Sequence, residues 1–83
     1  MSRVSGTIIC RSKSFTINSL KVASEKNVIV SLTTLNETAA KTLASGYYIQ
    51  VQPDFNKHDK KVIVTFVSAP SGDAKLSYTV FAQ

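Results

Sequence analysis

The sequence predicts an all-β protein, specifically a small antiparallel β-sandwich of about six strands. Val, Ile and Thr together supply 23 of the 83 residues, and β-branched side chains suit a pleated strand better than a helix. Apolar and polar residues alternate in several short segments, which is the period of a half-buried strand. Turn-forming residues separate these segments at short intervals, as they do in sandwiches and barrels.

Six segments of the chain show strand character. The expected strands cover residues 4–10, 13–17, 27–35, 47–52, 61–68 and 74–82. The breaks between them are polar, and the clearest is Pro70-Ser71-Gly72-Asp73, in which Pro fixes φ and Gly permits a positive φ. The chain has no long helical segments for the crossovers of a parallel sheet, so we expect antiparallel pairing.

Residues 36–46 have a different pattern. Asn36 is a favourable N-cap and Gly46 a favourable C-terminal residue for a helix. Ala39 and Ala40 between them favour helix. We expect one short helical turn or two near residues 37–45, with an ordered loop as the alternative.

Length and composition indicate one small globular domain over residues 1–83. The chain is 43% hydrophobic and 18% charged, which is too apolar for a disordered protein. No apolar run approaches the roughly 20 residues of a membrane-spanning helix. The opening Met1–Gly6 is followed by nothing like the apolar region of a signal peptide. The net charge is +5.

Catalysis and metal binding find little support in the residues. One Cys and one His exclude an internal disulfide framework, thiolate zinc sites and paired-His metal sites. His58, the only candidate base for a Ser-His-Asp triad, lies in a charged loop. Cys10 beside Arg11 is interpreted as a small buried residue rather than a nucleophile. We therefore predict a protein that is not an enzyme and has neither a cofactor nor a metal.

The alternation is imperfect, and it leaves apolar residues on the second face of the predicted sheets. These apolar residues can be scattered on the surface, or the second sheet can cover them, or they can pack on identical chains. We favour the last, a homo-oligomer with a trimer preferred over a dimer. The candidate interface residues are Ile29, Ile63, Val67 and Phe81.

Aromatic and polar residues around the fourth strand and the following loop are the candidate ligand contacts. They are Tyr47, Tyr48, Phe55, Asn56, Lys57 and His58. The alternative is ordinary packing for the tyrosines and a solvated loop for the rest. Lys57, Lys60 and Lys61 cluster beside Phe55, but the other basic residues are spread along the chain. Nucleic-acid binding is accordingly the weaker interpretation of the positive charge.

Three segments of the chain resemble known families. Arg3–Ile8 and then Val28–Asn36 are similar to the R-V-x-S-G segment and the later V-x-x-S-[LI]-x-x-[LI]-[DN] strand of H-type lectin domains. The run Gly72–Ala82 resembles the last strand of that domain. It also resembles the terminal strand of small β domains on bacteriophage tail fibres and virion decorations.

The resemblance implies a six-stranded antiparallel sandwich, a trimer and sugar binding. The lectins place aromatic and His side chains in the turn before the last strand, where this chain has Ala69–Asp73. No sugar-binding residue is therefore carried over.

These observations together predict a non-enzymatic structural or adhesion module, a self-associating component of a phage virion. The first alternative is a carbohydrate-binding protein like the H-type lectins, and the second is a nucleic-acid-binding β-barrel. The expected location is the virion, with the cytoplasm, or secretion without a visible signal, as alternatives. Other virion proteins or a surface glycan would be its further partners, and membrane association is not expected.

Overall fold

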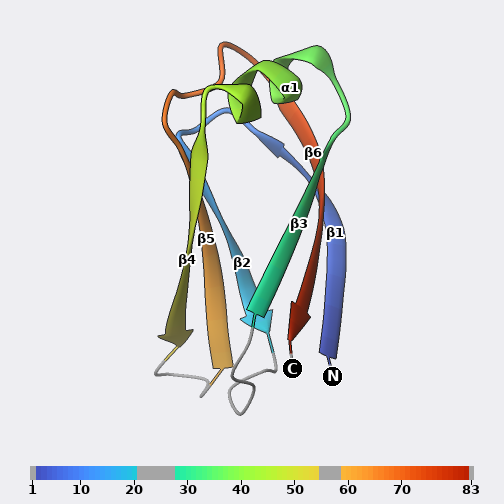
Figure 1. The fold of residues 1–83 in the computed structure, drawn as a ribbon, viewed down its shortest axis with the longest axis vertical. Coiled ribbons are helices and arrows are strands. Elements are labelled where there is room, and N and C mark those ends of the chain that lie inside the picture. Colours follow the sequence, from blue (N-terminus) through green and yellow to red (C-terminus); the bar gives the residue numbers. More distant parts are fainter. Residues whose placement is uncertain (1, 21–27, 55–58, 83) are drawn as a thin grey trace.

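The computed structural model describes residues 2–20, 28–54 and 59–82, which form six strands and one short helix (Figure 1). In chain order the elements are β1 (Ser2–Cys10), β2 (Ser14–Leu20), β3 (Val28–Thr34), α1 (Glu37–Ala44), β4 (Tyr47–Asp54), β5 (Asp59–Phe66) and β6 (Ala74–Ala82). The all-β prediction is confirmed. Within the 36–46 segment, α1 forms because both the capping residues and the alanines favour a helix.

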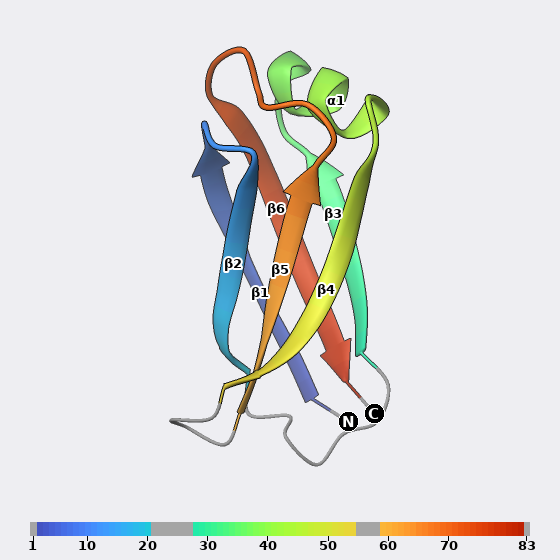
Figure 2. The same ribbon diagram turned by 90° about the vertical axis from the view of Figure 1, so that its left-hand side faces the viewer.

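The strands form two antiparallel sheets of three strands each. Their orders are β1-β6-β3 and β2-β5-β4, so β6 and β5 are the central strands. The two sheets lie face to face as layers, with β1 and β2 on one side of the sandwich and β3 and β4 on the other (Figure 2). Ser2 pairs with Ala82, which places the start of β1 beside the end of β6, away from α1.

Alternating residues of the two central strands build the core between the sheets. The completely buried hydrophobic side chains of these strands are Val62, Val64, Phe66, Ala74 and Leu76, with Val80 almost completely buried. On β2, Phe15 packs against Phe66 with ring centroids 6.0 Å apart. Removing this apolar surface from water is the main force that holds the layers together.

Asn36 fixes the position of α1 on the sandwich. Its Oδ1 accepts hydrogen bonds from the backbone N–H of Ala39 at 2.9 Å and of Lys75 at 3.1 Å, and its Nδ2 donates to the carbonyl oxygen of Asp73 at 2.8 Å. One side chain thus begins the helix and joins it to the start of β6. After the helix, Gly46 adopts a φ of 109° and leads into β4, a conformation that favours glycine.

Leu76→Ala should test the core. Leu76 is completely buried in β6, so the substitution removes apolar contacts and leaves a cavity. We expect a loss of about 2–5 kcal/mol in the free energy of unfolding, measured in urea. Thr16→Ala, on the exposed face of β2, is the control and should cost about 0.5 kcal/mol or less. Equal losses in the two variants would contradict this packing.

Asn36→Ala should show how much the Asn36 side chain contributes to the free energy of unfolding. The substitution removes the helix cap and the bonds to Asp73 and Lys75, and we expect a loss of about 2 kcal/mol in the free energy of unfolding, measured in urea. Glu37→Gln is a suitable control, since Glu37 is exposed and its ion pair with Lys41 lies on the surface of the same helix. Its effect should stay within about 0.5 kcal/mol. A tolerated Asn36→Ala would show that α1 is held by packing alone.

Candidate functional site

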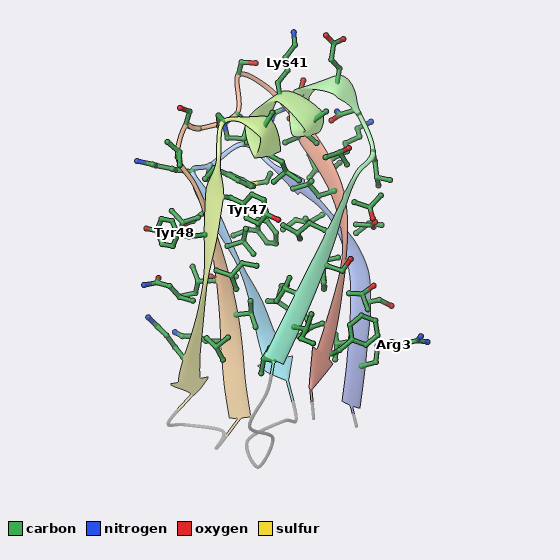
Figure 3. The ribbon with its side chains drawn as sticks, in the orientation of Figure 1. Arg3, Lys41, Tyr47 and Tyr48 are labelled. Atoms are coloured by element: carbon green, nitrogen blue, oxygen red, sulfur yellow. The ribbon has the colours of Figure 1, made fainter. Side chains whose placement is uncertain are left out.

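The tyrosines of the predicted ligand site point in opposite directions. Tyr47 and Tyr48 begin β4, where successive side chains face opposite sides of the sheet. Figure 3 shows Tyr48 projecting away from the sandwich and Tyr47 on the side of the other sheet. They cannot form one flat binding platform together. The remaining predicted contacts, Phe55, Asn56, Lys57 and His58, lie outside the described residues.

The predicted interface residues fall on different surfaces. Ile29 and Phe81 are direct partners in the β3–β6 pairing and face outward from the same sheet. Ile63 lies on the outer side of the other sheet, as its half-buried position between buried neighbours in β5 indicates. Val67 follows β5 and contacts the turn at Gly46. A single contact between two flat faces cannot use all four residues, and Ile29 with Phe81 form the group that lies together.

The outer face of the β1-β6-β3 sheet has apolar residues at both ends and hydroxyl residues between them. At the end away from α1, the register places Arg3, Phe81 and Ile29 in one row across the three strands. Two rows of small hydroxyl side chains follow. These rows are Ser5, Thr79 and Ser31, then Thr7, Ser77 and Thr33.

At the α1 end of the same face, apolar side chains flank a lysine. Ile9 pairs with Lys75, and the N–H of Leu35 donates to the carbonyl of Lys75 at 2.8 Å. Ile9, Leu35 and Lys75 line a surface hollow of about 400 Å³ together with Thr7 and Ile8. Ile9 is 60% exposed and Ile29, at the other end, 58% exposed. Sequence reasoning missed Ile9, although the adjacent apolar pair Ile8-Ile9 in a strand must point to opposite faces.

The loops at the α1 end carry the ion pair between Arg11 and Asp73. The guanidinium Nε donates to Oδ1 of Asp73. This hydrogen bond, together with the attraction between the charges, lowers the pKa of Asp73 and raises the pKa of Arg11. Because both side chains reach solvent, the pair has a small role in stability. The ion pair joins the β1–β2 turn to the residue that precedes β6.

Among the described residues, the cysteine is buried and no cluster of potential metal ligands is found. Cys10 is buried, and its Sγ donates to the carbonyl of Ser12 at 3.1 Å. Within residues 2–20, 28–54 and 59–82, no group of three or more His, Cys, Asp or Glu side chains could hold a metal ion. The same part of the chain contains no helix of the length and hydropathy needed to cross a membrane.

Comparisons with known proteins give no match to a family model, to a curated protein or to a solved structure.

Asp73→Asn should reduce the acid sensitivity of the protein. Since folding lowers the pKa of Asp73, its ionised form stabilises the native state above the ordinary titration range of aspartate. That contribution is lost as the pH falls through the lowered pKa. In urea titrations, wild type should therefore be more stable than the variant at pH 7, and this difference in the free energy of unfolding should be smaller at pH 2. Arg11→Gln should reduce the pH dependence in the same way. If the free energy of unfolding changed with pH to the same extent in wild type and both variants, the ion pair would be contradicted.

Proposed function

We propose that this protein is a non-enzymatic structural module that works as a homo-oligomer. The observation that carries the proposal is the apolar character of both ends of the β1-β6-β3 outer face. Ile9 and Leu35 at one end and Ile29 at the other are all more than half exposed. Large side chains in this arrangement on one flat surface are typical of contact sites between proteins.

Burial of these side chains would supply the energy of association. Completely burying one Leu or Ile side chain is worth about 1.5–3 kcal/mol, part of which offsets the entropy lost on association. The Ser and Thr side chains between the apolar ends are short, so a second surface can approach the sheet closely there. A copy of the same face is a suitable partner, since the apolar ends and the hydroxyl middle match in either direction along the strands. Arg3 and Lys75, which stand at the two ends of the face, would keep their charged groups in water at the rim of the contact.

The threefold assembly and the virion setting rest on a narrower basis. The trimer comes from the resemblance of Arg3–Ile8, Val28–Asn36 and Gly72–Ala82 to H-type lectin domains, and the virion setting from the resemblance of Gly72–Ala82 to phage-fibre domains. The small sandwich with exposed apolar faces is compatible with such a role. Tyr47 and Tyr48 face opposite sides of β4, so these two side chains do not act together as one stacking platform for a sugar or a nucleic-acid base.

Sedimentation equilibrium at about 100 μM protein should test the proposal. We expect a mass that is a multiple of 9.0 kDa, with three copies if the trimer expectation holds. Ile29→Lys should shift the protein toward the monomer, because the new charge would have to be desolvated in the contact. Thr16→Lys, which places the same charge on an exposed position of the other sheet, should leave the mass unchanged. A monomeric wild-type protein would overturn the proposal.

A further inference from the structure

We propose that the outer edge of β4 pairs with the β4 edge of a second copy. The two strands would run antiparallel about a twofold axis, so that two β2-β5-β4 sheets become one continuous six-stranded sheet. This inference rests on the proposed self-association and names a contact for it that is distinct from the β1-β6-β3 outer face. Being twofold, the contact would join monomers into dimers, or trimers into hexamers.

The backbone of β4 shows which residues face its outer edge. The N–H of Val67 donates to the carbonyl of Gly46 at 2.9 Å, in register with the pairing of Tyr47 with Phe66. Hydrogen-bonded pairs alternate along an antiparallel ladder. Tyr48, Gln50 and Gln52 therefore direct their backbone groups to β5. Tyr47, Ile49 and Val51 direct their N–H and C=O groups to the outer edge, where none of the described strands pairs with them.

This edge differs from the other three edges of the sandwich. Natural edges are usually blunted by charge, by a bulge or by a covering element. β1 carries Arg3, and β2 has a register shift between Ile17 and Leu20. β3 is uncharged like β4, but its inward side chains are half-buried, whereas Tyr47 and Val51 of β4 are exposed. Residues 47–52 of β4 have no charged side chain, in a protein of net charge +5. Two copies can therefore approach along this strand without direct repulsion.

Pairing about Ile49 would match the exposed side chains of the two strands. With Ile49 opposite its own counterpart, Tyr47 lies opposite Val51 of the second copy. Both face the interior side of the sheet, beside the buried Phe66 and Val62, yet they are 43% and 42% exposed. They would cover one another as an aromatic and β-branched pair, a combination that stabilises antiparallel strands.

Pro53 also favours this register. Moving the centre of pairing by one residue toward the C-terminal end would place Pro53 opposite Tyr47. Proline has no N–H to donate, so that alignment loses a hydrogen bond at each end of the contact. Centring the contact on Ile49 uses the edge groups of Tyr47, Ile49 and Val51 and leaves Pro53 outside the paired segment.

Position-specific crosslinking should test the contact. In a Cys10→Ala background, Ile49→Cys would place two thiols directly opposite one another, with Cα atoms about 5.5 Å apart, which suits a disulfide. Copper phenanthroline should convert most of this variant to a covalent dimer on non-reducing gels. Val51→Cys is the matched control, because the two Val51 positions would lie roughly 13 Å apart along the strands. It should crosslink at most about a tenth as efficiently. Equal crosslinking at the two positions would overturn the proposed register.

A charge variant keeps the inference testable if Ile49→Cys folds poorly. Val51→Lys would bring a charge from each copy into the paired segment, and we expect dimerisation at least about tenfold weaker by sedimentation. Gln52→Lys, on the outer side of the same strand, should have a smaller effect. Circular dichroism would verify that both variants keep the wild-type fold.

The outcomes separate this inference from the proposed function. An oligomer that is dissociated by Ile29→Lys, but neither crosslinked through position 49 nor weakened by Val51→Lys, would overturn the edge contact and leave the self-associating module standing. A dimer crosslinked at position 49 and insensitive to Ile29→Lys would support the edge contact and overturn the role of the outer face. A monomer without crosslinking would overturn both.

Discussion

A three-stranded sheet has only one strand that is paired on both sides, and this constraint shapes the whole molecule. In each layer the central strand, β5 or β6, contributes the completely buried side chains, while four of the six strands are edges. Inward-facing residues of β3 and β4, such as Val30, Leu32 and Ile49, are only partly buried, although they pack against the core. The sandwich is therefore well closed at its centre and less closed along the β3 and β4 side.

The two sides of the sandwich differ because the chain connects the strands on each side differently. On the β1 and β2 side, Cys10, Phe15 and Ile17 are buried, and the two strands follow one another through a short turn. On the other side, β3 and β4 are joined through α1, which lies across one end of the sandwich (Figure 1). The helix closes that end through Asn36 and buried Ala39, but it leaves the length of β4 accessible.

Much of the fold could be predicted because its signals are local. Alternation placed Val62, Val64 and Phe66 on one face of a strand, and burial in the structure agrees. The cap at Asn36 and the alanines predicted a short helix, although an irregular loop fitted the same residues. The second role of Asn36, its bonds to Asp73 and Lys75, could not be predicted, since those residues are more than thirty positions away in the sequence.

The sequence by itself determined the strand content, the short helix and the division of side chains into inner and outer rows, because these follow from residue type and from a period of two. Only the tertiary structure decided which outer rows lie side by side. It brought Ile29 next to Phe81, separated both from Ile63, and left β4 at an edge. Strand order depends on pairing between distant segments, and the local pattern of a strand does not specify its neighbour.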